Sequence, residues 1–229
     1  MRVCLASTSP ARLMLMRQAG IEPLLRAPDV DEEAVIDEVQ EREARILPPD
    51  EHVLLLARRK AADVAVSLVR DLPDFDGVVV GGDSMFEIDG QVLGKPLRPE
   101  IAVARWEQMR GKTGVLHSGH SVIRVRPGQP AREEHAVAAA AVTFVSDISD
   151  AEIAAYVATG EPLQVAGAFT VDSLGGPFIE RVDGDPSTVV GMSLSTVRRL
   201  CNALGIAWTD LWRSAPSRSG SAPDDGASS

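Results

Sequence analysis

Hydroxyl and guanidinium side chains gather just after the first apolar run. Ser7 and Ser9 follow a predicted strand over residues 2–6, and Arg12 lies three residues after Ser9. Ser9, followed by a proline, predicts the N-cap of a helix that Gly20 would end. The start of a helix binds phosphate well, because its free N–H groups and its dipole both favour an anion. Taken alone, the segment favours the alternative, an ordinary cap beside a surface arginine.

Asp83 is the strongest single candidate. The β-branched run before it predicts a strand over residues 77–81, buried on both faces, with Asp83 just past its end. Sites in open α/β sheets gather at the carboxyl ends of strands, where a carboxylate can hold a metal or take a proton from water. Gly81 and Gly82 would let a ligand approach closely. A turn or helix cap is the alternative, and we favour the functional interpretation.

Two lysines and a glutamate are weaker candidates. Lys95 is an isolated cation in a Gly-Lys-Pro sequence, Lys60 ends a basic run on a predicted helix, and Glu32 lies within an acidic run. Each alone is more typical of a solvated surface than of a site.

Several other chemistries are disfavoured. The sequence has no G-x-x-x-x-G-K-[ST] and no G-x-S-x-G motif, which argues against a P-loop enzyme and a nucleophile elbow. His117 and His120 are three residues apart on a predicted strand and would face opposite sides, so they are poor partners for one zinc ion. The net charge of -10 argues against a broad nucleic-acid surface, whereas a small anion needs only a local basic cluster or a metal.

The order of elements predicts an α/β or α+β protein with a mixed sheet. The acidic segment 29–51 is predicted to be in part a solvated loop, with Asp50 capping the next helix. The remaining predicted elements are a hairpin at Asp89-Gly90, a helix over residues 99–109, antiparallel strands over 117–126 and 136–145, a helix with a Ser149/Glu152 capping box that Gly160 ends, a strand over 178–182 and a helix over 193–204.

Composition and the chain ends suggest the compartment. Cys4 and Cys201 lie near opposite ends and form no disulfide framework. The first apolar run is too short for a signal peptide or a membrane span, so we expect a cytoplasmic protein that binds no membrane. Residues 214–229 are rich in Ser, Pro, Gly, Ala and Asp and are predicted to be a disordered tail after one domain over 1–213.

Short segments stand in a characteristic order over roughly residues 1 to 206. They are LASTSPAR (5–12), VDE (30–32), ARRKA (57–61), VGGDS (80–84), LGKP (93–96), GEP (160–162), AGAF (166–169) and GDPSTVVG (184–191). Together they resemble the Maf family of nucleotide pyrophosphatases, although each alone would be a weak signal.

The resemblance implies a two-lobed Maf/inosine triphosphatase-like fold with a nucleotide in a central cleft. It further implies hydrolysis of (d)NTPs or modified NTPs to a nucleoside monophosphate and pyrophosphate with Mg²⁺ or Mn²⁺, as a house-cleaning enzyme or a regulator of nucleotide pools, and a homodimer. The alternative is a nucleotide-binding regulator of cell division with little or no turnover. Implied roles are general base for Asp83, metal or water binding for Glu32 and Asp83, catalysis and phosphate binding for Lys60, and substrate binding for Ser7, Ser9, Arg12, Ser84, Lys95 and Asp172.

The chain departs from the family pattern at positions that bear on the choice of base. Ala11 replaces the first of two arginines, Ser84 replaces a threonine, and Asp172 lies where Ile-Gln-Gly is common. The resemblance therefore implies no preference for dTTP or UTP.

Overall fold

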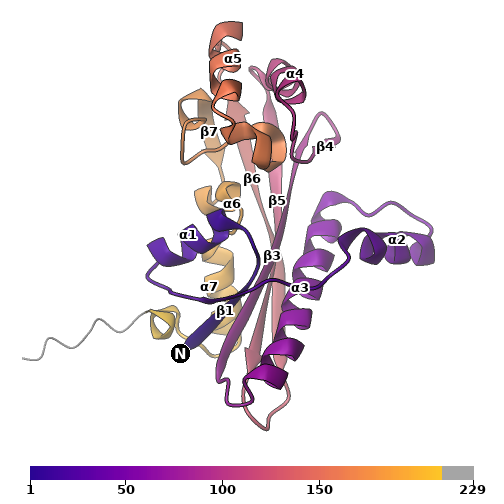
Figure 1. Cartoon of the computed structure of the whole chain (residues 1–229), viewed down its shortest axis with the longest axis vertical. Helices are drawn as coiled ribbons and strands as arrows, with labels where there is room; N and C mark the ends of the chain where they lie inside the picture. The colour runs from indigo at the N-terminus through magenta and orange to yellow at the C-terminus, as the bar shows by residue number, and fades with distance from the viewer. Residues whose placement is uncertain (213–229) are drawn as a thin grey trace, which may run out of the picture.

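The computed structural model describes residues 1–212 and contains a seven-stranded mixed sheet with helices on both faces (Figure 1). The expected α/β class with a mixed sheet is confirmed, and the predicted tail over 214–229 lies outside the described residues. The strands are β1 (Arg2–Ala6), β2 (Leu24–Arg26), β3 (Gly77–Ile88), β4 (Gln91–Leu93), β5 (Thr113–Val125), β6 (Arg132–Phe144) and β7 (Ile179–Asp183). The helices are α1 (Pro10–Gln18), α2 (Glu32–Glu43), α3 (Pro49–Asp71), α4 (Pro99–Met109), α5 (Asp150–Ala158), α6 (Pro186–Val190) and α7 (Leu194–Ala203), with short 3₁₀ segments at Glu161–Gln164, Ala166–Ala168, Gly176–Phe178 and Trp208–Leu211.

Strand β3 has a gap in its pairing. The sheet order is β2-β1-β3-β5-β6-β7, and β5 pairs with one edge of β3 from Gly77 to Glu87. On the other edge, β1 runs parallel to residues 77–81 and β4 runs antiparallel to residues 86–88. Residues 82–85 therefore have no strand partner on that edge among the described elements. We call residues 82–85 the open edge of β3.

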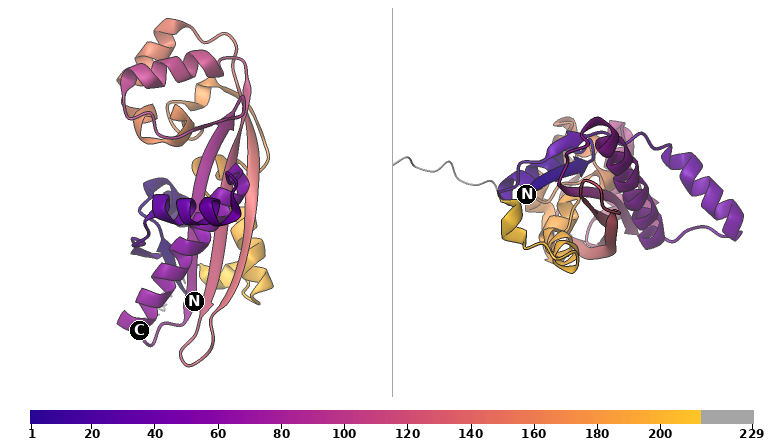
Figure 2. Two further views of the ribbon diagram at one scale, coloured as in Figure 1. Left: turned by 90° about the vertical axis from the view of Figure 1, so that its right-hand side faces the viewer. Right: turned by 90° about the horizontal axis from the view of Figure 1, so that it is seen from below.

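Helix α3 packs directly on the face formed by β3 and β5, while α7 packs on the opposite face (Figure 2). Two glycines make the approach of α3 possible. A Cβ atom at Gly81 would lie 2.3 Å from the Ala57 carbonyl oxygen, and one at Gly119 would lie 2.2 Å from the Val53 carbonyl oxygen. The expectation that Gly81 makes room for a ligand is therefore wrong, because the helix backbone already occupies that space.

The long strands connect separate hydrophobic clusters. One cluster surrounds Trp106 at the end of the sheet that α4 and α5 cover, and the Trp106 indole N–H donates to the Ala168 carbonyl at 2.8 Å. Aromatic residues make up only 4% of the chain, yet most of them meet there in edge-to-face pairs. A second cluster lies under α1 and α7, and a third lies between α3 and the sheet.

Several predicted boundaries need correction. Strand β3 continues unbroken to Ile88, so Asp83 lies within a strand and not past its end. The acidic segment contains helix α2, which Asp31 caps. Pro48 occupies the N-cap position of α3, so Asp50 lies in the first turn and is not the cap. Among residues 1–212, no helix combines the length and apolar character that crossing a lipid bilayer requires.

Candidate active site

Lys60 lies between two carboxylates on the α3 face of the sheet. Its Nζ atom is 2.7 Å from Asp83 Oδ1 and 2.8 Å from Glu32 Oε1. The Lys60 and Asp83 side chains are 9% and 15% exposed, whereas that of Glu32 is 50% exposed. Helix α3, strand β3 and the first turn of α2 thus contribute one charged group each to a single ion cluster. This arrangement brings together residues from three distant parts of the chain.

Arg12 occupies the other side of β3. Its Nε donates to the Gly191 carbonyl at 2.8 Å, Nη1 to Ser7 Oγ at 3.2 Å and Nη2 to Ser84 Oγ at 3.2 Å. A guanidinium has five N–H donors, so two donors have no partner within the described part of the chain. Burial lowers the pKa of Arg12, while the charges of Asp83 and Glu32 raise it, which places both carboxylates within electrostatic reach.

The strand register explains why these groups meet. Adjacent residues of a strand point to opposite faces, so Asp83 faces α3 with Gly81, and Ser84 faces the side of α1 and α6 with Gly82. Side chains from the two faces of the sheet can approach each other at the open edge of β3, because β1 ends before it. The start of α1 follows β1 directly and brings Arg12 to this point. The site therefore depends on the length difference between β1 and β3.

Two buried residues of β5 extend the Arg12 side of the site. Ser118 Oγ is 3.0 Å from Ser84 Oγ and 3.4 Å from His120 Nε2. His120 Nε2 accepts a hydrogen bond from the Ser193 backbone N–H at 2.9 Å, so the neutral ring carries its proton on Nδ1. Burial, together with the Arg12 charge, lowers the pKa of His120 to about 4. Sequence reasoning considered His120 for zinc and missed this role, because the partner residues come from elsewhere in the chain.

His52 is a further residue that sequence reasoning missed. It lies on α3 two turns before Lys60 and is half-buried. Burial lowers the pKa of His52, the charges of Asp83 and Glu32 raise it, and Lys60 lowers it. His52 therefore belongs to the surroundings of the ion cluster, and its position on the same helix as Lys60 was the available signal.

The remaining predicted site residues fall into two groups. Ser7 Oγ accepts from the Ser9 N–H at 3.1 Å, and Ser9 caps α1 by accepting from the Arg12 N–H at 3.4 Å, so both are beside Arg12. Lys95 and Asp172 are exposed on other segments, after β4 and after Ala168. Within residues 1–212, neither makes a hydrogen bond or ion pair with the ion cluster or with Arg12.

The donor set of the predicted metal site is a pair of carboxylates. Within the described residues, no group of three or more His, Cys, Asp or Glu side chains is arranged to hold a metal ion. Glu32 and Asp83 nevertheless both place an oxygen within 2.8 Å of one nitrogen, which is the kind of oxygen pair that Mg²⁺ shares with substrate phosphates.

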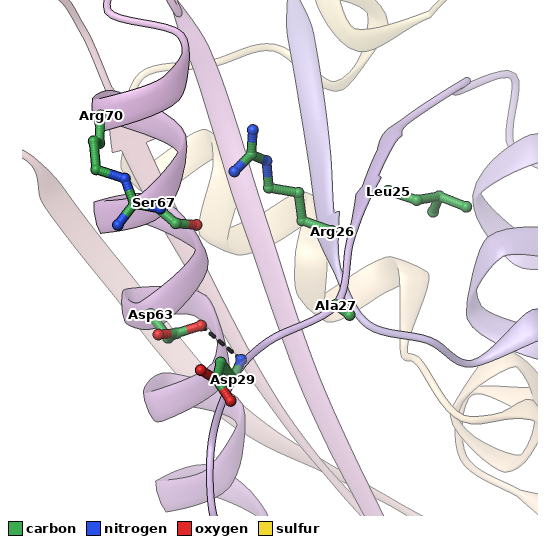
Figure 3. A pocket seen from close by; sticks show the side chains of 7 residues that line it. All are labelled: Leu25, Arg26, Ala27, Asp29, Asp63, Ser67 and Arg70. Atoms are coloured by element: carbon green, nitrogen blue, oxygen red, sulfur yellow. Dashed lines mark hydrogen bonds between the residues drawn. The ribbon is translucent and has the colours of Figure 1, made fainter.

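A hollow of about 490 Å³ lies beside this region, between helix α3 and strand β2 with the segment that follows it (Figure 3). None of the predicted site residues lines it. The two arginines that line the hollow, Arg26 and Arg70, both pair with Asp71, which lies outside the lining. Asp63 Oδ2 accepts from the Asp29 backbone N–H at 2.8 Å. Both arginines of the hollow are thus already engaged by Asp71, and we assign the hollow no role. The lining residues are Leu25, Arg26, Ala27, Asp29, Asp63, Ser67 and Arg70.

Comparison with known proteins identifies the family. The family described as Maf-like protein matches residues 2–204. A protein of Leifsonia xyli subsp. xyli named nucleoside triphosphate pyrophosphatase is 58% identical over 94% of this chain and 98% of its own. A protein of the same name from Rhodococcus jostii is 49% identical over 92% of this chain and 96% of its own. The match to the structure of the Staphylococcus aureus Ham1 protein covers 64% of this chain and 73% of that chain at 9% identity, with a TM-score of 0.30. Matched over nearly its whole described length, the chain belongs to the Maf-like protein family.

Proposed function

We propose that the protein hydrolyses nucleoside triphosphates between the α- and β-phosphates and releases pyrophosphate and a nucleoside monophosphate. The relatives named nucleoside triphosphate pyrophosphatase support this reaction class. The observation that carries the proposal is the contact of Lys60 with both Glu32 and Asp83 at the open edge of β3, with Arg12 across the same edge. The groups of helices at the two ends of the long strands would form the two lobes around the nucleotide.

Asp83 is the proposed general base. Its Oδ1 atom accepts from Lys60, and Oδ2 has no hydrogen-bond partner among residues 1–212, so one carboxylate oxygen is available for water. In the proposed step, the oxygen of that water attacks the α-phosphorus while Asp83 takes its proton. The bond from the α-phosphorus to the bridging oxygen breaks, and its electron pair leaves with pyrophosphate. No covalent intermediate is needed.

The cations stabilise the leaving group. Pyrophosphate gains negative charge as the bond breaks, and fixed donors in a partly buried site stabilise such charge better than water does. Arg12 would supply its two remaining N–H donors, and Lys60 would exchange a carboxylate contact for a phosphate. Lys95, on the segment that follows β4, would reach the triphosphate from the α4–α5 end.

Glu32 and Asp83 would hold Mg²⁺ or Mn²⁺, because both are oxygen donors and both contact the same Lys60 nitrogen. When bound, such an ion lowers the pKa of water and neutralises charge on the phosphates. The homodimer is also a proposal, on family resemblance alone; light scattering should give twice the mass of one chain, and the mass of one chain would contradict it.

The test is hydrolysis of a panel of NTPs in ¹⁸O-water, followed by phosphorus NMR. Attack at the α-phosphorus places the label in the monophosphate, and attack at the β-phosphorus places it in pyrophosphate. Diphosphate with orthophosphate would contradict the proposal. Nucleotide binding without turnover would favour the regulatory alternative.

Asp83→Asn tests the base. The substitution keeps the side-chain size and removes the proton acceptor, so we expect kcat to fall by about 10²–10⁴-fold while the protein stays folded. Asp37→Asn, on the exposed side of α2, is the control and should leave kcat unchanged. Near-normal kcat in Asp83→Asn would remove Asp83 from this role.

A further inference from the structure

We propose that Ser118 and His120 are positioning residues that hold the Arg12 guanidinium in the orientation that binds a triphosphate. The inference rests on the proposed function, because it takes Arg12 as a phosphate ligand. Both residues are fully buried in the middle of β5, so they act through Arg12 and do not touch the substrate.

The hydrogen bonds between Arg12 and His120 run in one direction. Arginine can only donate, so the Ser84 hydroxyl must accept from Arg12 Nη2. The Ser84 proton is then free to point to Ser118 Oγ at 3.0 Å or to the Gly191 carbonyl at 3.2 Å. At the far end, His120 Nε2 can only accept, because the Ser193 N–H points at it. Ser118 can therefore accept from Ser84, and its own proton can point to the Asp83 carbonyl at 3.3 Å or to His120 Nε2 at 3.4 Å, where it shares the single lone pair with the Ser193 N–H.

The Gly191 carbonyl is the second anchor of Arg12. It accepts from Arg12 Nε at 2.8 Å and lies 3.5 Å from Ser118 Oγ. Gly191 follows α6, and its φ of 124° is in the region that favours glycine. Asp185 fixes this turn, because it caps α6 through the Ser187 N–H and also accepts from Ser193 Oγ at 2.7 Å.

Ser193 joins the two anchors. Its backbone N–H donates to His120, and its hydroxyl donates to Asp185. Hydrogen bonds to Asp185 offset its burial and lower its pKa to about 2, so it stays charged near neutral pH. Arg12 is therefore held from two sides, by Ser84 through Ser118 and by Gly191 through the α6–α7 turn, and both sides are tied to His120.

Ser121 provides a matched control on the same strand. It is as fully buried as Ser118, but it lies on the α3 face, and its hydroxyl donates to Glu133 Oε1 at 3.0 Å. Ser118→Ala and Ser121→Ala thus remove the same atom from the same strand, and only the first is connected to Arg12.

The experiment is calorimetric titration with inorganic tripolyphosphate in EDTA, which avoids any dependence on the base. We expect Ser118→Ala to raise the Kd about tenfold, or about 1.4 kcal/mol, and Ser121→Ala to change it less than about twofold. In an Arg12→Ala background, Ser118→Ala should have no further effect, because its contribution passes through Arg12. His120→Phe, which keeps bulk and removes the acceptor, should behave like Ser118→Ala.

The outcomes separate the two proposals. Equal Kd values for wild type and Ser118→Ala overturn the inference, as does an undiminished Ser118→Ala effect in the Arg12→Ala background, which a purely structural role would produce. If the wild-type protein binds neither tripolyphosphate nor any NTP, the proposed function fails and the inference fails with it. Should His120→Phe not fold, the Ser118 and Ser121 variants still decide.

Discussion

Replacing Lys60 by methionine tests the ion cluster most directly. The substitution keeps most of the apolar stem and removes the ammonium that lies 2.7 Å from Asp83 and 2.8 Å from Glu32. Two carboxylates then face each other without the charge that separates them, and Asp83 is largely buried. The expected result is a less stable protein with a vacant place for a cation.

The magnitude follows from the burial of the three groups. Removing one partner of a buried ion pair destabilises a protein by about 3–5 kcal/mol. Because Glu32 is half exposed, water screens part of the repulsion, and we expect the lower value of about 3 kcal/mol. For a chain of this size, that corresponds to a fall in Tm of about 6–12 °C.

Divalent metal should reverse much of this loss. An ion that binds only the folded protein stabilises it by about 2.7 kcal/mol at a free concentration of 100 times its Kd. In the wild type, Lys60 competes with the ion for the same oxygens, so the metal should stabilise wild type less than Lys60→Met. The measurement is thermal unfolding in EDTA and then in Mg²⁺ or Mn²⁺.

Lys112→Met is the matched control. Lys112 Nζ is 2.6 Å from Asp89, but both side chains are 46% exposed, and a surface pair contributes at most about 1 kcal/mol. If Lys60→Met lowers the Tm no more than Lys112→Met does, or if metal raises the Tm of both equally, the reasoning about the cluster is refuted.

Three further predictions concern packing, pH and phosphate binding. Gly119→Ala should lower the free energy of unfolding by about 2–3 kcal/mol in urea, because its Cβ would lie 2.2 Å from a backbone carbonyl of α3; a loss no larger than that of Gly94→Ala, where the space is open, would contradict this. The pKa of His120 is about 4 in the folded protein against an ordinary 6.5, so the unfolded chain takes up its proton at a higher pH. Up to about 3 kcal/mol of stability, present above pH 6.5, should therefore be lost as the pH falls to 4. His120→Gln should lack this loss, and a variant whose stability depends on pH as the wild type's does would contradict the prediction. Lys95→Ala should raise KM for NTPs about tenfold and leave the Tm unchanged, since Lys95 is exposed, and an unchanged KM would remove it from the phosphate site.

Local signals predicted local structure well. The first strand matches β1, the helix over 99–109 matches α4, and the Ser149/Glu152 capping box is present. Asp89 and Gly90 have φ values of 52° and 72°, as the tight hairpin requires. In each case, the residues that determine the conformation are neighbours in the chain.

Non-local features escaped sequence reasoning. Gly81 and Gly82 were interpreted as the end of a strand next to Asp83. The structure explains Gly81 by the backbone of α3, and it places Arg12 Nε 3.3 Å from where a Cβ atom of Gly82 would lie. The segment of helix α2 was interpreted in part as loop, because its sequence is acidic and has few apolar residues. In the structure, the helix buries only Ile36 and Val39. Lys60 was expected to favour the surface, and its burial depends on carboxylates 28 positions before it and 23 after it.

The candidate site divides in the same way. Asp83 was favoured from its place beside a buried strand, whereas Glu32, Lys60 and Arg12 were predicted from the ordered motifs of a resembled family. The structure places Lys60 between Glu32 and Asp83. Ser118 and His120 have no motif of their own. Their importance to Arg12 comes from the strand register that puts Ser118 opposite Ser84, which no pattern in the linear sequence specifies.

Strands β3, β5 and β6 run unbroken for 12 or 13 residues, about 40 Å, and each contributes side chains to clusters at both ends of the sheet. Within residues 1–212, these continuous strands consequently join the two ends. A change in the angle between them has to be spread along the whole hydrogen-bonded ladder as torsion. A ligand spanning both ends would therefore bind to a stiff frame, with little reorganisation left to perform on arrival.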